Sequence, residues 1–573
     1  MEVEFGYLAP LAERVRSVKP RGQAIYEFIE PEKVKAYLPF EHQFVSNLLT
    51  QKTVRNWETG GYFIASQTGS GKSTLIMEVI APVAISRGAR ILLIVPRVAL
   101  AMQYKKEIAS EYCPEALDEL QEEGIRKRTN WGPFDVYVMQ SLVKKQEREE
   151  IWRKRATYDF VLMDEGHVFL SDSVFVPFTY ELFRFLVCEV GRNCKRVYLT
   201  ATPDIILTEV AEMESKIPGR PLPGRNWAGD FKEEIYLTLY QFKEDYRYLS
   251  PRFFEKEETI LKRLEELPSN EKAVIFVRSK NQGLRLQKIL GGAEKAVYMD
   301  AENKMTMERE TLSSIINEQS FKPQFLIATR FLDVGVNLKD LKIRTVVLFQ
   351  RFKEDILQML GRKRLTSGET VNLYLKVPTR KEVLGEIEEM EEDYQAMMRA
   401  QKRYETRTEN WSNEIPMPLF LYEKNGKREI GCNHFSYRIN EYHRRQLEAY
   451  VDGTEDELGF RQTFIRTVLS WFPMHKEAVD IEKEDKALSS LEEELDALLE
   501  SYLGQELDKK AALELCNHIF CVMKISRRSD QKDNLGLSSL KKAFEQYGIR
   551  YGIFNQSRGG KAGIWVVQKG EWK

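Results

Sequence analysis

The stretch "GYFIASQTGSGKSTLIMEVIAPVAIS" (61–86) joins a short apolar run to a helix-periodic run through a glycine-rich turn. This order predicts a buried strand, a phosphate-binding loop and a helix. Gly69 and Gly71 allow successive backbone N–H groups to turn toward an anion, and the N-terminus of the helix adds a favourable dipole. Lys72 is then placed to neutralise the phosphates of a nucleotide, and the Ser73 hydroxyl is placed to bind Mg²⁺.

The loop departs from the usual pattern at one position, because Ser66 stands where glycine is expected. Taken alone, the run therefore also fits an ordinary glycine turn. The loop residues expected to surround a nucleotide are Gln67, Thr68, Gly69, Ser70, Gly71, Lys72, Ser73 and Thr74.

The acidic stretch "VLMDEGH" (161–167) supplies the second half of a hydrolytic site. Asp164 ends an apolar strand and is expected to hold Mg²⁺ together with Ser73. Glu165 follows it and is expected to orient and deprotonate the attacking water. His167 is expected to contact neighbouring elements of the sheet. The loop and the acidic pair together favour hydrolysis of a nucleoside triphosphate over a chance turn.

Apolar runs of strand length alternate with polar, helix-periodic stretches through most of the chain. Such alternation predicts parallel sheets that helices cover on both faces. The runs form two series, so the sequence predicts two tandem α/β domains of similar size. The runs lie at 61–66, 89–96, 134–139, 158–164 and 196–203, and then at 234–240, 272–277, 295–300, 324–329, 344–349 and 371–377.

The same patterns predict the division of the chain into parts. A proline- and glycine-rich segment at 217–227 is the expected linker between the two α/β domains. The expected parts are a mainly helical segment at 1–57, a first lobe at 58–225, a second lobe at 226–378, a helical accessory region at 379–504 and a basic domain at 505–573.

Charge is distributed unevenly along a chain whose formal net charge is only −1. Residues 476–502 carry 10 acidic and 3 basic side chains, whereas residues 521–573 carry 11 basic and 4 acidic ones. The acidic helix is a candidate surface for a protein partner. The basic end reads as a helix and a glycine-tipped hairpin, which fits either a winged helix or a small α+β cap. Its candidate DNA contacts are Arg550, Arg558 and Lys561, and the alternative is a solvated basic hairpin.

Cysteine content and hydropathy favour a cytoplasmic protein. Six cysteines in 573 residues are sparse and fit a reducing compartment. The stretch "CNHIFC" (516–521) has an apolar helical pattern, so a packed helix is favoured over a zinc site. No run of about 18 apolar residues occurs, so no membrane-spanning helix is expected.

Taken together, the motifs resemble those of superfamily 2 helicases and translocases. "SQTGSGKS" (66–73), "DEGH" (164–167) and "LTATP" (199–203) resemble motifs I, II and III. Four further stretches are similar, in the expected order, to motifs Ia, IV, V and VI: "PRVALAMQ" (96–103), "VIFVRSK" (274–280), "ATRFLDVGVNL" (328–338) and "QMLGRKR" (358–364). The resemblance covers about residues 38–378 and implies ATP, Mg²⁺ and two recombinase-like lobes that step along nucleic acid.

The resemblance also implies roles for single residues. Gln43, in "FEHQ" (40–43), would read adenine, and Gly335 of motif V would lie at the nucleotide. An ordinary strand–helix junction remains the alternative for motif Ia, and motif IV is the weakest match. The residues implied to contact nucleic acid are Pro96, Arg97, Gln103, Ser279 and Thr329.

Motif VI departs from the family pattern, in which two arginines stand three residues apart. Arg362 follows Gly361 in register and is expected to contact the γ-phosphate. The second arginine position is Leu365, and Arg364 comes one residue early. On a continuing helix this shift turns the side chain by about 100°, so Arg364 has DNA, the interlobe interface or solvent as its target. A shorter "GRxR" form of the motif would return Arg364 to the nucleotide.

"LTATP" resembles the third motif of DNA-directed members more closely than that of RNA helicases. We therefore expect an ATP-dependent DNA helicase or translocase. An RNA-remodelling ATPase and a nucleic-acid-stimulated switch that does not unwind are the alternatives.

Overall fold

The computed structural model divides the chain into two compact units. The first unit comprises Met1–Pro251 and Glu255–Ala478, and the second comprises Arg252–Phe254 and Val479–Lys573. The structure describes residues 34–40, 44–119, 122–215, 217, 237–300, 314–315, 318–329, 337–365, 368–405, 418–424, 427–523, 535–546, 551–558 and 561–570.

The first sheet of the first unit has eight strands in the order β1-β8-β2-β7-β6-β3-β5-β4. Its strands are β1 (Val34–Phe40), β2 (Gly60–Ala65), β3 (Arg90–Val95), β4 (Asn130–Trp131), β5 (Phe134–Val138), β6 (Tyr158–Asp164), β7 (Lys195–Thr200) and β8 (Leu237–Phe242). All pairs are parallel except β4 with β5. Non-consecutive neighbours require crossovers, and these place helices on both faces of the sheet.

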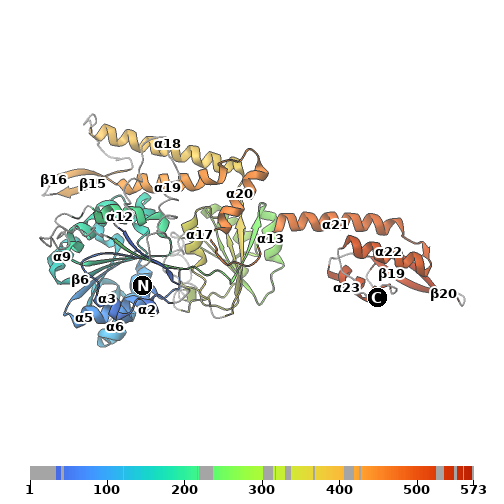
Figure 1. Ribbon diagram of the computed structural model, residues 1–573, viewed down its shortest axis with the longest axis horizontal. Coiled ribbons are helices and arrows are strands. Elements are labelled where there is room, and N and C mark those ends of the chain that lie inside the picture. Colours follow the sequence, from blue (N-terminus) through green and yellow to red (C-terminus); the bar gives the residue numbers. More distant parts are fainter. Residues whose placement is uncertain are drawn as a thin grey trace, which may run out of the picture. The chain divides into compact units, whose positions relative to one another are not determined.

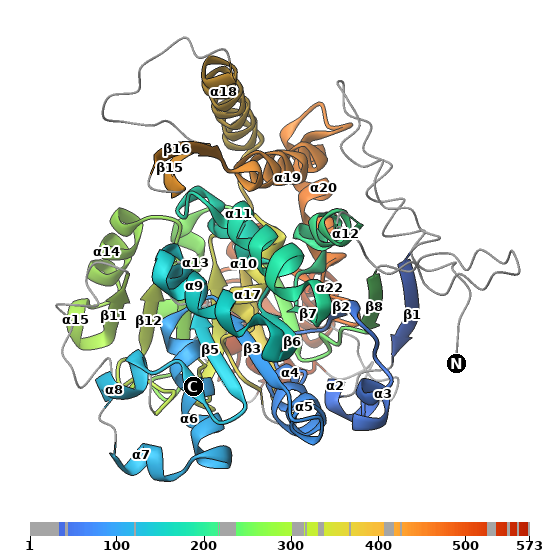
Figure 2. The same cartoon turned by 90° about the vertical axis from the view of Figure 1, so that its left-hand side faces the viewer.

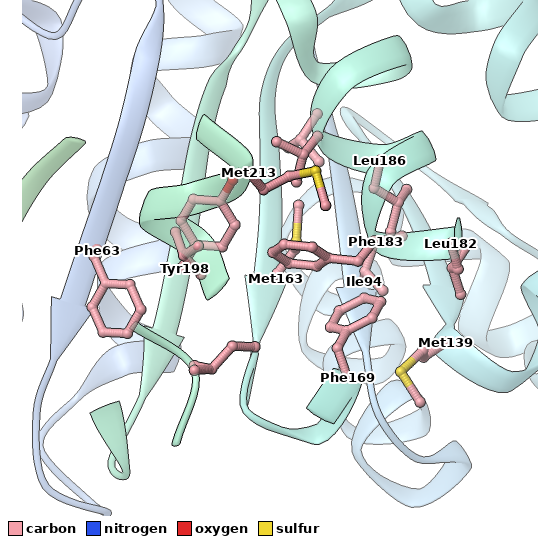
Figure 3. Close-up of a cluster of buried hydrophobic side chains, with 14 of the residues drawn as sticks. Phe63, Ile94, Met139, Met163, Phe169, Leu182, Phe183, Leu186, Tyr198 and Met213 are labelled. Atoms are coloured by element: carbon pink, nitrogen blue, oxygen red, sulfur yellow. The ribbon is translucent and has the colours of Figure 1, made fainter. Parts of the chain in front are cut away.

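Helices cover the first sheet on both faces, as Figure 2 shows. One face holds α2 (Val45–Leu48), α3 (Gln51–Arg55), α5 (Ala81–Ser86) and α6 (Val98–Tyr112); the other holds α9 (Lys145–Lys154), α10 (Val168–Ser171), α11 (Thr179–Arg184) and α12 (Leu207–Ser215). Side chains alternate along each strand, so β3 sends Ile91 into one core and Leu92 into the other. In Figure 3, Phe169 and Phe183 pack against the strands, with ring centroids 5.2 Å apart. Both faces of the sheet are therefore covered by apolar side chains, which explains why the strand sequences are nearly uninterrupted apolar runs.

The second sheet of the first unit runs in the order β11-β12-β10-β13-β14-β9. Its strands are β9 (Leu249–Phe254), β10 (Lys272–Phe276), β11 (Ala296–Met299), β12 (Phe325–Ala328), β13 (Ile343–Leu348) and β14 (Val371–Lys376), and the helices that the site uses are α14 (Lys280–Ile289) and α17 (Lys353–Leu360). The pairs among β10, β11, β12, β13 and β14 are parallel. The unit thus contains two tandem recombinase-like parallel sheets, as the sequence predicts.

Two strand assignments from the sequence need correction. Residues 34–40, expected in a helical segment, form β1 at the edge of the first sheet, where Pro39 removes no interior ladder bond. The run at 234–240, assigned to the second lobe, gives β8, which pairs with β2 in the first sheet. The second sheet therefore begins at β9, which the sequence did not reveal. The predicted linker at 217–227 lies outside the described residues except for Ile217.

The accessory region of the first unit contains a long helix, a hairpin and two further helices. They are α18 (Arg380–Glu405), β15 (Leu419–Lys424), β16 (Lys427–Cys432), α19 (His434–Val451) and α20 (Glu457–Leu469). Helices α18 and α19 run side by side (Figure 1), and the Tyr437 hydroxyl donates to the Met397 carbonyl oxygen. Asn433 donates to the Ser173 carbonyl oxygen of the first lobe at 3.2 Å, and Gln446 accepts from the Lys353 N–H of the second lobe. Helix α19 and its N-terminal cap residue therefore form hydrogen bonds with both lobes.

The second unit has a core of its own. Its elements are β17 (Val479–Asp480), α21 (Ile481–Ser501), β18 (Glu506–Leu507), α22 (Lys509–Val522), α23 (Leu537–Gln546), β19 (Tyr551–Arg558) and β20 (Lys561–Lys569). β17 pairs with Arg252 and Phe253, and the three-stranded antiparallel sheet has the order β18-β20-β19. "CNHIFC" lies on α22, and its Cys516 is fully buried in the core, so the helix prediction for this stretch is confirmed.

Among the residues that the structure describes, none of the helices is long and apolar enough to cross a membrane.

A buried ion pair stabilises the first lobe. Arg196 on β7 donates to Glu214 on α12 at 2.7 Å and 2.8 Å, and both side chains are fully buried. We predict that Glu214→Ala lowers the free energy of unfolding by about 3–5 kcal/mol, because it leaves a buried charge unpaired. Chemical denaturation and hydrogen exchange of β7 measure this effect. Glu181→Ala, which removes an exposed partner of Arg184, is the control and is expected to cost at most about 1 kcal/mol. Equal effects of the two substitutions would contradict the prediction.

Candidate nucleotide site between the two lobes

The glycine-rich loop has the backbone of a phosphate cradle. Gly69 and Gly71 have φ of 82° and 84°, in the left-handed region that favours glycine. Lys72 is buried, and its Nζ donates to the Ser66 and Gln67 carbonyl oxygens at 3.1 Å and 3.3 Å. Ser66 Oγ also accepts a hydrogen bond from the Ser70 hydroxyl at 3.0 Å. The serine that departs from the usual pattern is therefore part of the closure of the loop.

The loop leads directly into a helix that runs from α4 (Lys72–Thr74) through a π-helical turn (Leu75–Ile80) into α5. Its N-terminal cap is Gly71, so the free N–H groups of the first turn lie at the loop. A Cβ at Gly71 would lie 3.1 Å from the Phe44 ring. The cradle thus depends on glycine both for its backbone conformation and for the close approach of Phe44.

The acidic pair lies beside this loop at the carboxyl end of β6. Asp164 Oδ1 accepts a hydrogen bond from the Glu165 N–H at 3.0 Å, and Glu165 has a φ of 49°. The Tyr104 hydroxyl, on α6, is 2.7 Å from Asp164 Oδ2 and 3.2 Å from Ser73 Oγ. Ser73 and Asp164, which sequence reasoning assigned to Mg²⁺, are therefore joined through Tyr104, which it missed. The only sequence signal for Tyr104 is its place directly after the "PRVALAMQ" stretch.

Buried charges shift one another's pKa values in this site. Burial and the charge of Glu165 raise the pKa of Asp164 to about 6, against the opposing charge of Lys72. Burial also opposes ionisation of Glu165, but the positive charges of Lys72, His167, Arg362 and others outweigh it and lower its pKa. Burial lowers the pKa of Lys72, although Glu165 and Asp164 oppose this effect. The surrounding positive charges therefore favour the ionised form of Glu165, which is the form that a general base requires.

His167 connects the acidic pair to the stretch "LTATP". Its Nδ1 lies 3.0 Å from Thr200 Oγ1 and 3.5 Å from Glu165 Oε2. Thr200 Oγ1 also accepts from the Thr202 N–H at 3.0 Å. His167 therefore links Glu165 to the turn after β7 through one charged contact and two hydrogen bonds, and it contacts a neighbouring strand as the sequence predicts.

The second lobe reaches the same site through α17. Gln358 donates to Glu165 Oε2 at 3.5 Å, and its carbonyl and amide oxygens each accept from Arg362 at 3.1 Å. A Cβ on Gly361 would lie 2.5 Å from Thr68 Oγ1, so only glycine allows this approach of the two lobes. Gly361, directly after α17, thus packs closely against Thr68 of the phosphate loop.

Arg364 faces the phosphate loop, which corrects the helix-register argument from the sequence. That argument assumed a continuing helix, but α17 ends at Leu360, and the Arg364 N–H donates to the Leu338 carbonyl oxygen at 2.8 Å. Arg364 Nε donates to Asn337 Oδ1 at 2.8 Å, and its Nη1 would lie 3.1 Å from a Cβ on Gly69. Burial and Arg362 lower its pKa to about 10, whereas Glu165 and Asp164 oppose this. The geometry favours the shorter "GRxR" form of the motif.

Gln67 has a partner that the sequence did not indicate. Its amide donates to the Asp245 carbonyl oxygen at 3.2 Å and accepts from the Asp245 N–H at 3.0 Å. The Gln67 side chain therefore binds the segment between β8 and β9, where the chain passes from one sheet to the other. Thr68, Ser70 and Thr74 lie in the loop and the first helical turn as expected.

The residues expected to contact nucleic acid lie on both lobes. Pro96 and Arg97 join β3 to α6, where Arg97 forms a bidentate ion pair with Asp172, with Nη2 2.8 Å from Oδ1. Gln103 on α6 donates to Glu107 at 2.9 Å. Ser279 caps α14, and the Thr329 N–H donates to the Met299 carbonyl oxygen after β12.

Three of the expected residues, Gln43, Gly335 and Arg550, lie outside the described residues. Arg558 and Lys561 face one another in the register of β19 and β20, in the second unit.

The residues of the site fit a magnesium-bound nucleoside triphosphate. The Ser73 hydroxyl and the Asp164 carboxylate are the hard oxygen ligands that Mg²⁺ prefers. Lys72, Arg362 and Arg364 bring three cations to one place, in excess of the two carboxylates. Such a surplus of positive charge beside a helix N-terminus suits a polyphosphate.

Two family models match the chain. One is described as "Type III restriction enzyme, res subunit" and matches residues 34–205; the other, "Helicase conserved C-terminal domain", matches residues 255–364. The first match holds the phosphate loop and the acidic pair, and the second ends with Arg364. No curated protein matches the chain significantly.

Several solved structures are similar to the chain at low identity. Mss116p bound to ssRNA and AMP-PNP has 15% identity and a TM-score of 0.41, with 58% of this chain and 69% of that chain covered. Dbp5 of S. cerevisiae, bound to RNA and ADP BeF3, has 11% identity and a TM-score of 0.38, with coverage of 55% and 79%. Lhr of Mycobacterium smegmatis, bound to ssDNA and AMP-PNP, has 15% identity and a TM-score of 0.38, with coverage of 58% and 46%. At these TM-scores the strand order, rather than the overall likeness, establishes the fold.

We predict that Gly361→Ala abolishes most ATP turnover while nucleotide binding to the first lobe persists. The added methyl group would meet Thr68 and push α17 away from the phosphate loop. Steady-state turnover and equilibrium nucleotide binding measure the two effects. Gly385→Ala, on α18 with open space around it, is the matched control and should be neutral or slightly stabilising. Normal turnover of Gly361→Ala would show that the lobes do not need this approach.

Proposed function

Because the chain belongs to superfamily 2 of the helicases and translocases, and is an ATP-hydrolysing enzyme, we propose that it couples ATP hydrolysis between its lobes to movement along DNA. The observation that supports this proposal is the contact between polar and charged side chains of the two lobes. Gln358 and Arg362 of the second lobe contact one another and reach Glu165 of the first. A nucleotide bound there would join the lobes, and hydrolysis would release them.

Each group in the site has a role that its surroundings support. Lys72 and Arg364 neutralise the β- and γ-phosphates, and Glu165 takes the proton of the attacking water. Ser73 and Asp164 would hold Mg²⁺, which would supply positive charge against the negative charge that develops on the phosphates. Arg362, held by Gln358, keeps positive charge beside Glu165.

Movement requires that both lobes grip the polymer in turn. Arg97, Pro96 and Gln103 are the proposed contacts of the first lobe, and Ser279 and Thr329 those of the second. Arg97 is already paired with Asp172, so a phosphate would compete with that carboxylate for its guanidinium. Asp172 follows α10, the short helix that comes after the acidic pair, and this places polymer binding and hydrolysis in neighbouring segments.

DNA is favoured over RNA by the "LTATP" stretch and by the second unit. Its elements run β18, α22, α23, β19, β20, an order that fits a winged helix with β19 and β20 as the wing. We propose that Arg550, Arg558 and Lys561 contact duplex phosphates. A cytoplasmic location and a protein partner at the acidic helix stay predictions.

ATP turnover without polymer, with single-stranded DNA, with duplex DNA and with RNA tests the proposal. We expect DNA to stimulate turnover more than RNA does, and tailed DNA duplexes to reveal unwinding or translocation. Stronger stimulation of turnover by RNA would indicate an RNA-remodelling ATPase instead. Stimulation by DNA without movement would make it a switch.

We predict that Glu165→Gln retains ATP binding and loses hydrolysis, because an amide cannot accept the proton of water. Lys72→Ala should lose hydrolysis as well, because backbone N–H groups alone do not neutralise the phosphates. Single-turnover hydrolysis and binding of a fluorescent ATP analogue separate the two effects. Wild-type turnover of Glu165→Gln would require another base.

Arg362 and Arg364 both follow the end of α17 at Leu360, and we predict a larger role for Arg364 than the sequence suggests. Arg364→Ala should reduce turnover by about 10³-fold or more, because its guanidinium lies over the phosphate loop. Arg362→Ala should also reduce turnover, with loss of the Gln358 contact to Glu165. Arg285→Ala, an exposed arginine of α14, is the control and should change little. Full activity of Arg364→Ala would contradict this assignment and leave Arg362 as the arginine that contacts the γ-phosphate.

Paired substitution of the hairpin, Arg558→Gln with Lys561→Gln, should reduce the salt dependence of duplex DNA binding. Loss of two phosphate contacts lowers the slope of log K against log salt concentration by up to about 1.8. Lys569→Gln, on β20 and paired with Glu500, is the matched control and should leave the slope unchanged. Binding isotherms at four salt concentrations measure the slope. An unchanged slope in the paired variant would remove the hairpin from the DNA interface.

A further inference from the structure

Tyr104 is the described side chain that bonds to both Ser73 and Asp164. It lies on α6, its side chain is almost fully buried, and its ring packs in the core beneath the first sheet. A phenylalanine would serve that core equally well. A buried hydroxyl is costly unless it is hydrogen-bonded, so the oxygen of Tyr104 points to a role at the two side chains that it contacts.

The three groups form a chain with a defined direction. Asp164 Oδ2 is 2.7 Å from the Tyr104 oxygen and, as a carboxylate, accepts its single proton. The Tyr104 oxygen lies 3.2 Å from Ser73 Oγ. Because Asp164 takes the only tyrosine proton, Ser73 must be the donor in this second contact. This leaves lone pairs on Ser73 Oγ and on Asp164 free for a cation. Both expected metal ligands are therefore oriented by one hydroxyl.

We propose that Tyr104 is a positioning residue that holds Ser73 and Asp164 in the geometry for Mg²⁺ and transmits nucleic-acid binding at the start of α6 to the metal site. It does not touch the nucleotide. The proposal rests on the proposed function, because it takes the start of α6 as a polymer contact.

The helix itself supplies the connection. Arg97 caps α6, and Tyr104 lies seven residues later, about two turns along the same helix. Ala101 and Ile108, around Tyr104, are buried in the core, so a displacement at the start of α6 would be carried along the packed helix to Tyr104. When a phosphate displaces Asp172 from Arg97, a small shift of this helix changes the distance from the Tyr104 hydroxyl to Asp164. The metal ligands thus respond to an event two turns away.

Tyr104→Phe tests the proposal, with Tyr158→Phe as the matched control. Tyr158 is a buried tyrosine of the same lobe whose hydroxyl donates to buried Asp135 at 2.9 Å, at the opposite end of β6 from Asp164. The first readout is binding of a fluorescent ADP analogue as Mg²⁺ is titrated, without polymer. The second is ATP turnover with and without single-stranded DNA, at low and at saturating Mg²⁺.

We expect Tyr104→Phe to shift the Mg²⁺ midpoint of nucleotide binding by about 10- to 100-fold, as loss of an outer-shell partner does. Nucleotide binding in EDTA should equal that of the wild type, which shows that the variant is folded. Saturating Mg²⁺ should recover polymer-free turnover, while the stimulation by DNA stays reduced. Tyr158→Phe should match the wild type in both readouts.

A wild-type Mg²⁺ midpoint in Tyr104→Phe would overturn the positioning role. A shifted midpoint with full DNA stimulation would overturn the transmission. If the wild-type protein itself shows no stimulation by nucleic acid, the proposed function fails, whereas the Mg²⁺ titration still decides the role of Tyr104 at the metal ligands.

Discussion

The structure of the catalytic region depends on one crowded contact, where the backbone of Gly361 lies against Thr68 of the phosphate loop. A side chain at Gly361 would place a carbon 2.5 Å from Thr68 Oγ1, so the lobes meet only because this residue is glycine. Beside that contact, Gln358 connects two opposite charges: it donates a hydrogen bond to Glu165 and accepts one from Arg362. Because these groups are buried, each charge would be costly without its partners. The groups come from both lobes, so neither lobe alone carries a complete hydrolytic site.

Helix α19 contacts both lobes of the first unit. Phe435 lies in the core of the first lobe, whereas His443 stacks on Phe352 of the second, with ring centroids 4.0 Å apart. His443 also pairs with Glu354 at the N-terminus of α17, at 2.5 Å. The helix therefore contacts α17 at the end opposite to Gly361.

The sequence predicted those features of the molecule that depend on neighbouring residues in the chain. The apolar run before Gly69 and the one before Asp164 each specify a strand and its catalytic end locally. β8 could not be assigned, because its pairing with β2 joins segments about 175 residues apart. The position of Arg364 stayed open because the register argument assumed a continuing helix, whereas α17 ends at Leu360. Tyr104 resembled any buried aromatic residue, and only its hydroxyl partners distinguish it.

The distance between the lobes, measured by pulsed electron paramagnetic resonance, tests the central claim most directly. With one spin label on α9 and one on α14, a non-hydrolysable ATP analogue with Mg²⁺ should narrow the distance distribution of the wild type. Arg364→Ala should still bind the analogue and lose the narrowing, because the second lobe no longer reaches the phosphates. An identical narrowing in Arg364→Ala, or none in the wild type, would contradict a site shared by both lobes.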